Sequence, residues 1–443
     1  MKQPLFAGAA AIDITPATSL HLFGYPHTKR QSTGVHDPLL SSALYLRAGS
    51  EQQLFIGNDV IFVPKDLAAR ARGRLEASTG VPAGAICLSA THTHSGPDTV
   101  AYASNTDDDT LSPPDAGFLQ QLEDGIVAAG EAAVREAVLA EVAFAVADSA
   151  CVGGNRRDPR GPSIPEAPVW YVRHVETQDP IALMLIVSMH PTVLHEDSTL
   201  YSGDFPGMAR KRLQEAWLGP EAPVIYHTGA CGNQSPRHVV QGNTFAEAER
   251  LGNALADSVI VAMAAPKFTA ELALGHRTTT TRLPLRDFPN EAQAATALDT
   301  AQARYAALKK AKPGTPETRT AEVDLFGAQE TLTLAKAAKK GTLKAAAEAC
   351  MPAEVQCFRI GRQRIAAFPG EIFVEFVLDL QSEFPGLHAI TMANGELQGY
   401  LVTAEALEEG GYEANNALFK SPDGGDILMD HAAELLCEPE LAV

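Results

Sequence analysis

Hydrophobic positions along the chain form two kinds of pattern, short apolar runs and longer segments in which apolar residues recur at helical spacing. Short runs bounded by turn residues are typical of buried strands, and the periodic segments are typical of amphipathic helices. The runs predict strands over residues 9–14, 44–47, 53–56, 85–89, 140–147, 181–189, 223–227, 355–360 and 364–368. The periodic segments predict helices over residues 65–78, 115–136, 204–216 and 244–263, with one more after Glu371. This alternation predicts an α/β fold with central, mostly parallel or mixed β-sheets flanked by helices.

The segment 289–349 differs from the rest because it consists mainly of Ala, Lys, Glu, Gln and Leu at helical spacing. Residues 312–316, Lys-Pro-Gly-Thr-Pro, interrupt the pattern near its middle. Proline and glycine at such a position end one helix and allow the chain to turn into another. We therefore expect a helical hairpin inserted near 289–349 into a single domain that spans 1–443.

Composition and charge exclude several classes of function. The chain has 443 residues, of which 45% are hydrophobic and 20% charged, so it can bury a large core. Its formal net charge of −19 repels phosphate backbones, which argues against a nucleic-acid partner. The apolar run at residues 5–12 stops at Asp13, so neither a transmembrane segment nor a signal peptide is expected. Six scattered cysteines without a Cys-x-x-Cys pair are typical of reduced thiols and a cytoplasmic location. None of these features indicates an oligomeric state.

Two histidines follow the predicted strand 85–89 directly, in the segment 91–97, Thr-His-Thr-His-Ser-Gly-Pro. Alternation in extended backbone would place the His92 and His94 side chains on one side. Neutral imidazoles at such spacing are good ligands for Zn²⁺. The alternative is a pair of loop histidines bonded to the backbone, and a motif this short does not decide between the two.

Further candidates lie at the ends of other predicted strands. His190 follows the strand 181–189, and Glu371 follows the strand 364–368. Each alone has a structural explanation, as a polar cap or as an acid favoured in a first helical turn. Their shared place at strand ends favours function, because a parallel sheet gathers such residues at one edge. Ser235 lies in a tight turn without the Gly-x-Ser-x-Gly elbow, and Arg156 could be an ordinary solvated loop charge.

The ordered combination of motifs along the chain resembles the catalytic domain of the neutral and alkaline, non-lysosomal ceramidases. Members of this family are zinc amidases that cleave the N-acyl bond of ceramide. The matching segments are Asp13-Ile14-Thr15-Pro16, 34–39, 91–97, Asn155-Arg156, His190-Pro191-Thr192, 232–236, Pro369-Gly370-Glu371, Asn394-Gly395, 400–403 and Gly411-Tyr412-Glu413. They are spread over most of the chain, and their combination is far more specific than any one of them.

The resemblance implies one Zn²⁺ per chain, with four protein ligands. These ligands are His92, His190, Glu371 and Tyr400. A tyrosine is acceptable among them because a bound zinc ion favours the ionised form of a ligand. The resemblance also implies that four catalytic side chains face the substrate: His94, Ser235, Arg156 and Tyr412.

The implied mechanism uses a zinc-bound water as the nucleophile that attacks the amide carbon. His94 and Tyr412 would stabilise the oxyanion or protonate the leaving amine, and Arg156 would anchor a polar or anionic group of the substrate. Ser235 would either bond to the substrate or act as a nucleophile, and we favour the first because no base partner is evident.

The chain departs from the family in four respects. Its serine turn reads Gly-Asn-Gln-Ser-Pro-Arg where the family has Gly-Asp-Val-Ser-Pro-Asn. Neither a C-terminal immunoglobulin-like domain nor a secretory signal is expected, and the hairpin near 289–349 has no family counterpart that we can place.

The sequence therefore predicts a zinc-dependent hydrolase of a linear amide, either a small molecule or a lipid. Two alternatives remain on the same scaffold, a zinc esterase or lactonase and an amidase for a small soluble substrate. A third is a non-catalytic zinc-binding protein. A long apolar groove beside the metal would favour a lipid, and a small polar pocket would favour a soluble amide.

Overall fold

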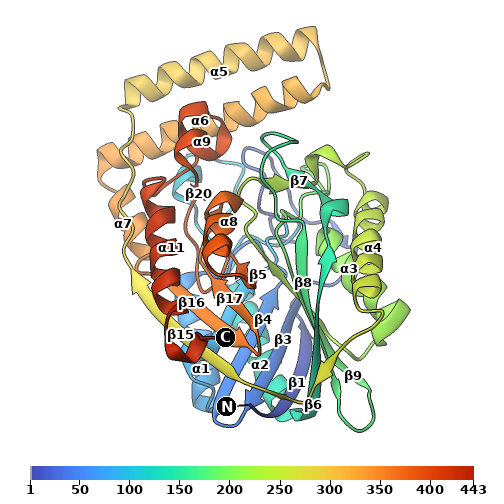
Figure 1. The fold of residues 1–443 in the computed structure, drawn as a ribbon. Helices are drawn as coiled ribbons and strands as arrows, with labels where there is room; N and C mark the ends of the chain where they lie inside the picture. The colour runs from blue at the N-terminus through green and yellow to red at the C-terminus, as the bar shows by residue number, and fades with distance from the viewer. Residues whose placement is uncertain (1) are drawn as a thin grey trace.

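The computed structural model describes residues 2–443, and its strands form one large mixed sheet and a second, four-stranded sheet (Figure 1). The main path of the large sheet runs through β11 (Val224–Thr228), β9 (Pro180–Val187), β8 (Glu166–His174), β6 (Val138–Asp148), β1 (Gln3–Asp13), β3 (Leu40–Ala48), β4 (Glu51–Asn58) and β5 (Ile86–Ala90). Its central pairs are antiparallel, and the pairs at its two ends, β9 with β11 and β4 with β5, are parallel. The prediction of mixed sheets is thereby confirmed.

The second sheet lies against the first and has the order β15-β16-β17-β19. Its strands are β15 (Leu274–Thr281), β16 (Ala353–Ile360), β17 (Gln363–Ala367) and β19 (Leu387–Ile390). Phe55 of β4 and Phe358 of β16 join the two sheets, with ring centroids 4.9 Å apart. The remaining strands are short: β2 (Gly34–Val35), β7 (Gly154–Asn155), β10 (Leu200–Tyr201), β12 (Gln234–Ser235), β13 (Phe268–Thr269), β14 (Glu271–Leu272), β18 (Glu371–Ile372) and β20 (Tyr400–Leu401).

The two ends of the large sheet come together, although many strands separate them along its path. β4 and β11 approach so closely that a Cβ on Gly57 would lie 2.4 Å from the carbonyl oxygen of Tyr226. Ser89 Oγ lies 2.6 Å from His227 Nδ1, and Thr228 Oγ1 donates to the Thr91 carbonyl oxygen at 2.8 Å. These contacts bring the loop after β5 beside the loops after β9 and β11.

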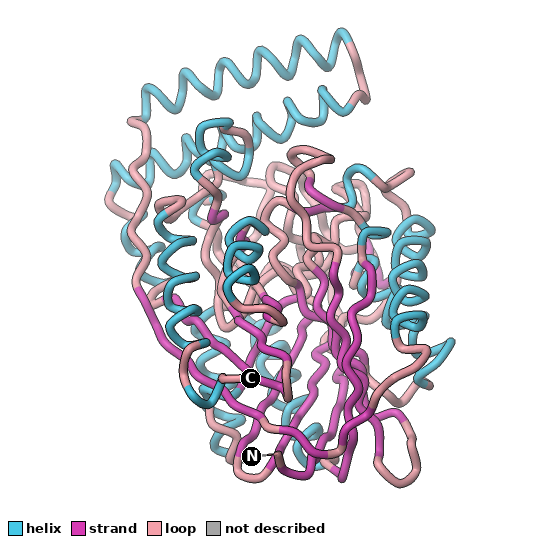
Figure 2. Tube along the Cα trace, in the orientation of Figure 1, coloured by secondary structure: helices cyan, strands magenta, loops and turns pink. Residues whose placement is uncertain are grey.

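Helices cover the outer faces of both sheets, as Figure 2 shows by its cyan segments. The covering helices are α1 (Lys65–Thr79), α2 (Ala116–Arg135), α3 (Asp204–Leu213), α4 (Phe245–Ala262), α8 (Val374–Glu383) and α11 (Asp423–Leu436). Two short helices, α9 (Ala404–Glu409) and α10 (Tyr412–Asn415), follow β20. α1 and α2 cover the half with β1 and β3, α3 and α4 the half with β6, and α8 and α11 the second sheet. The helix predicted over residues 204–216 ends earlier in α-form and continues as a π-helical turn at Gln214–Leu218.

The predicted hairpin is confirmed as two long helices, α5 (Glu291–Ala311) and α6 (Pro316–Lys340), followed by the short α7 (Leu343–Ala349). α5 lies outermost in Figure 1, and Ala294 is its one buried residue. α6 lies between α5 and the body of the protein, where it packs against α10 and the turn Ala103–Asn105. The hairpin therefore covers the end of the molecule at which the candidate site residues gather.

A buried ion pair fixes the segment after β4. Asp59 is fully buried and accepts from Arg210 of α3 at 2.8 and 2.5 Å, and from the Leu40 main-chain nitrogen at 2.9 Å. Removing one member of such a pair leaves a buried charge without compensation. Asp59→Ala is therefore expected to lower the free energy of unfolding by about 3–5 kcal/mol, measured by chemical denaturation.

The control for this prediction is Asp257→Ala, which breaks a pair to Arg212, also on α3. Both side chains of that pair are about half exposed, and their atoms lie 3.1 Å apart. Solvent-exposed pairs contribute about 1 kcal/mol or less. Equal losses of unfolding free energy in the two variants would contradict the role given to Asp59.

Within residues 2–443, no helix combines the length and the apolar character that a membrane crossing requires.

Candidate metal centre

His92 lies in the loop after β5, and its backbone holds it in an unusual conformation. Its φ is +65°, in the left-handed region that residues other than glycine rarely adopt. Its main-chain nitrogen donates to the Val60 carbonyl at 3.0 Å, and its Nδ1 lies 2.8 Å from the Ile61 carbonyl. The two imidazoles of the motif share one side because of this turn, and not because of the extended alternation that the sequence suggested. Such strained residues cluster at functional sites.

His190 follows β9 and is held by a second pair of carbonyls. Its Nδ1 lies 2.6 Å from the Cys231 carbonyl oxygen and 3.0 Å from that of Gln234. A carbonyl oxygen only accepts, so Nδ1 carries a proton in both His92 and His190. A ring that is protonated only at Nδ1 presents the lone pair of Nε2 to a metal. Burial, followed by the charge of Arg156, lowers the pKa of His190 to about 4, so the ring is neutral at physiological pH.

Both lone pairs face the carboxylate of Glu371. Glu371 Oε2 lies 3.0 Å from His190 Nε2 and 3.5 Å from His92 Nε2, and His92 Nε2 has no hydrogen-bond partner within residues 2–443. Three acceptor atoms this close repel one another unless a cation or an added proton lies between them. A metal ion satisfies all three at once, so the residues present fit a divalent metal.

Tyr400 is brought to Glu371 by the short parallel pair β18–β20, in which the two residues are direct register partners. Burial and the Glu371 carboxylate raise the pKa of Tyr400 well above its usual range, and the Arg156 guanidinium acts in the opposite direction. That guanidinium lies 5.3 Å from the centre of the Tyr400 ring. Arg156 therefore offsets part of the effect of burial and of the carboxylate, which together keep the phenol protonated.

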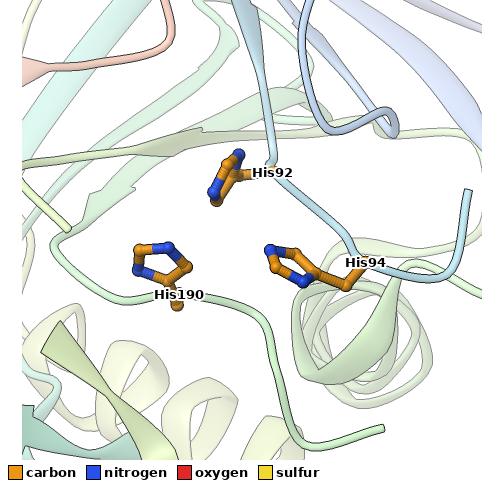
Figure 3. Close-up of side chains that lie close together, drawn as sticks. All are labelled: His92, His94 and His190. Carbon is orange, nitrogen blue, oxygen red and sulfur yellow. The ribbon is translucent and has the colours of Figure 1, made fainter. Parts of the chain in front are cut away.

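His94 lies on the same loop as His92, and its ring points toward those of His92 and His190, as Figure 3 shows. Ligand nitrogens of His92, His94 and His190 all lie within 4.8 Å of one another. Burial lowers the pKa of His94 well below its usual range, and the two neighbouring imidazoles act in the same direction. Both His94 ring nitrogens are buried without a partner in the described part of the chain. The geometry allows His94 either to bind the ion or to face a substrate beside it.

The loop between His21 and Gln31, which a β-bridge joins, makes room for His94. A Cβ on Gly24 would lie 2.4 Å from His94 Nδ1, so only glycine fits there. Tyr25 packs edge-on against the imidazole with ring centroids 5.2 Å apart, and Arg30 Nη1 donates to the His94 carbonyl at 2.8 Å. These contacts set the orientation of the ring.

A cavity of about 40 Å³ opens beside these histidines, enough for a few water-sized groups. Six phenylalanine and tyrosine side chains line it: Phe23, Tyr25, Phe62, Tyr102, Tyr400 and Tyr412. Polar side chains outside the metal cluster also line it: Asn105, Glu330 and Asn416. The cavity is thus small and of mixed character, unlike a long apolar groove.

The other predicted site residues occupy different positions. Tyr412 lines the cavity, and its hydroxyl accepts from Asn416 Nδ2 at 3.0 Å. Arg156 lies behind Tyr400, where its Nε donates to Glu413 at 2.7 Å and its Nη2 is buried without a described partner. Ser235 pairs with Gly154 outside the cavity, and its Oγ accepts from the Arg237 main-chain nitrogen at 3.3 Å.

The structure adds cavity residues that the sequence did not single out, above all Glu330 of α6. Its neighbours on the buried face of that helix are small or apolar, among them Gly327, Thr331 and Leu334. A lone carboxylate on such a face was the available signal, because acidic residues are almost never fully buried without a partner. The helical composition of the hairpin concealed it.

Neutral imidazoles, a carboxylate and an adjoining cavity define a candidate catalytic metal centre on an α/β fold. No protein-family model matches this chain, and no curated protein sequence matches it. Among solved structures, the neutral ceramidase from Pseudomonas aeruginosa is similar with a TM-score of 0.73 and 16% identity, over 99% of this chain and 74% of that chain. A ceramidase complexed with C2 is similar with a TM-score of 0.74 and 17% identity, over 99% of this chain and 75% of that chain. The chain therefore has the neutral ceramidase fold, which confirms at the level of the fold the resemblance seen in the sequence.

Proposed function

We propose that this protein is a ceramidase-like, zinc-dependent hydrolase of linear amides. The observation that carries the proposal is the convergence of His92 Nε2 and His190 Nε2 on Glu371, beside a cavity. The neutral ceramidase fold, shared over 99% of the chain, supports the same assignment. A non-catalytic zinc site would be closed by its ligands and typically rich in cysteine, whereas this cluster has none and opens onto a cavity.

The donor set favours zinc over other common metals. Two or three neutral imidazoles with one carboxylate suit Zn²⁺, whereas Mg²⁺ and Ca²⁺ prefer oxygen ligands alone. His92, His190, Glu371 and Tyr400 would hold the ion. The chemistry supplied by zinc in such a site is polarisation of the amide carbonyl and a lowered pKa for a bound water.

The protein's own side chains handle the protons. In the hydrolysis, an oxygen of water bonds to the carbonyl carbon, the C–N bond breaks, and a proton of that water passes to the leaving nitrogen. The neutral His94 imidazole would accept this proton and return it to the nitrogen. The Tyr412 hydroxyl already accepts from Asn416, so its hydrogen remains free to donate to the oxyanion.

Arg156 and Ser235 take no part in the proton transfers. Arg156 would stabilise a Tyr400 phenolate formed on metal binding, and its unpartnered Nη2 could also bond to a polar group of the substrate. Ser235 is engaged in capping the turn that follows it, and its assignment as a substrate hydrogen bonder stays a prediction.

The cavity size favours a small soluble amide as the substrate over long-chain ceramide. About 40 Å³ accommodates a short acyl group, and polar side chains stand among its aromatic rings. We therefore expect kcat/KM to fall as the acyl chain lengthens from acetyl to palmitoyl in a series of N-acyl amines. A matched ester series tests the esterase alternative in the same assay.

Removal of the metal tests the proposed function directly. Dialysis against a strong chelator is expected to lower amide hydrolysis by at least about 10³-fold, because water then loses its activation. One equivalent of Zn²⁺ per chain should restore it, as followed by elemental analysis alongside the hydrolysis rate. Full activity in protein that contains almost no zinc would contradict the proposal.

A further inference from the structure

The Glu330 carboxyl in α6 is buried in the wall of the candidate site without a partner for one of its oxygens. The residue is 2% exposed and lines the same cavity as His92 and His94. Its Oε2 has no hydrogen-bond partner in the part of the chain that the structure describes. The hydrolysis outlined above does not use this group.

The surroundings of Glu330 are acidic and aromatic. Burial raises the pKa of Glu330 to about 8, a hydrogen bond from Asn105 lowers it, and the charges of Glu371 and Asp108 raise it further. Two cations of the same helix are engaged elsewhere, Lys336 with Asp107 at 3.0 Å and Arg319 with Glu196 at 2.7 Å. A cationic ligand would offset the cost of this buried acid better than a neutral one.

The aromatic side chains of the cavity favour the same kind of ligand. Phe23, Phe62 and Tyr102 line the cavity, and ammonium groups are bound in proteins by the π faces of such rings. Tyr25 already has the Arg30 guanidinium 4.9 Å from its ring centroid. A carboxyl and several rings around one small space therefore match a protonated amine. The formal net charge of −19 also steers cations towards the protein.

Close packing holds Glu330 in place. A Cβ on Gly327, one turn before it, would lie 3.5 Å from the Tyr412 Cα, so α6 and α10 are in direct contact. Thr331 Oγ1 lies 3.3 Å from the Asn415 carbonyl oxygen at the same interface. A side chain fixed in this way discriminates between ligands better than one on a mobile loop.

We propose that Glu330 is a specificity-determining residue that binds a protonated amino group of the substrate. The preferred substrates are then short amides that carry an ammonium group away from the bond that is cleaved. This inference rests on the proposed function for the reaction, but the ammonium site can be tested without it.

The kinetic test compares substrates that differ by one charge. N-acetyl-1,4-diaminobutane and its uncharged isostere N-pentylacetamide are hydrolysed by the zinc-loaded enzyme, and the ratio of their kcat/KM values is measured. We expect the charged amide to be preferred, and Glu330→Gln to lower the ratio by about 10- to 100-fold, the range for a hydrogen bond to a charged group. The control Glu317→Gln changes an exposed glutamate at the start of the same helix and should leave the ratio unaltered. A ratio that Glu330→Gln leaves unchanged, or a wild-type preference for the uncharged amide, would overturn the inference.

Calorimetric titration separates the two proposals. Butylammonium chloride is expected to bind the wild-type holoenzyme with saturation, and Glu330→Gln should weaken that binding by 10-fold or more in Kd. If ammonium binds in this way but no amide is hydrolysed, the proposed function fails and the ammonium site stands. Absence of saturable binding to the wild type, or equal binding to both proteins, would refute the ammonium site. A thermal melt of Glu330→Gln, with the Tm at or above that of the wild type, shows that the isosteric change leaves the fold intact.

Discussion

Replacing His92 with alanine is expected to abolish both metal binding and amide hydrolysis. The substitution removes Nε2, one of the lone pairs that face Glu371, and frees the Ile61 carbonyl that held the ring. The remaining ligands then bind the ion too weakly to retain it through desalting. We expect less than about one tenth of an equivalent of zinc by elemental analysis, and a loss of kcat/KM of about 10³-fold or more.

The control for this experiment is His431→Ala. His431 is half-buried at the surface of α11 and pairs with Glu434 at 3.2 Å. It is not among the residues that line the cavity of the candidate site. The His431→Ala variant should retain one equivalent of zinc per chain and the turnover number of the wild type. Residue 92 lies in the left-handed region, where alanine is also strained. Unfolding free energies should therefore be measured for both variants. Retention of stoichiometric zinc by His92→Ala would remove His92 from the ligand set.

Replacing His94 with alanine is expected to keep the zinc and to lower kcat by about 10²- to 10⁴-fold, the usual contribution of a general acid or base. The outcome is informative because the His94 nitrogens lie within 4.8 Å of those of His92 and His190. Zinc stoichiometry and kcat are therefore measured on the same preparation. Loss of zinc together with turnover would make His94 a ligand and would contradict its role in proton transfer.

Chemical rescue provides a second readout for His94. The substitution leaves a space bordered by Gly24 and Tyr25, in which the missing ring packed. Added imidazole should enter this space and raise kcat in His94→Ala, with no effect on His92→Ala. A purely structural histidine would give no such recovery, because the lost contacts would not depend on proton transfer.

The elements with the strongest local patterns were predictable from the sequence. The buried run at residues 85–89 corresponds to β5, and the apolar run 223–227 corresponds to β11, because continuous burial leaves a local signature. The hairpin was visible in composition and in the proline and glycine at its turn. Strand partners other than chain neighbours such as β3 and β4 were not, because pairs such as β1 with β6 and β9 with β11 join residues far apart in the chain.

For the candidate site, the sequence by itself determined which chemistry is available. It placed His92, His94 and His190 after buried strands, and its ordered motifs singled out Glu371 and Tyr400. Local patterns carry this information because strand ends and turn residues are encoded by near neighbours.

Only the tertiary structure decided how these groups meet. It packed Gly57 of β4 against Tyr226 of β11, set Glu371 opposite Tyr400, and turned His92 into the left-handed region so that its ring faces His190. It also carried Glu330 from a distant helix into the cavity wall. These arrangements arise from packing between segments that are tens to hundreds of residues apart, and such packing leaves no periodic trace in either segment alone.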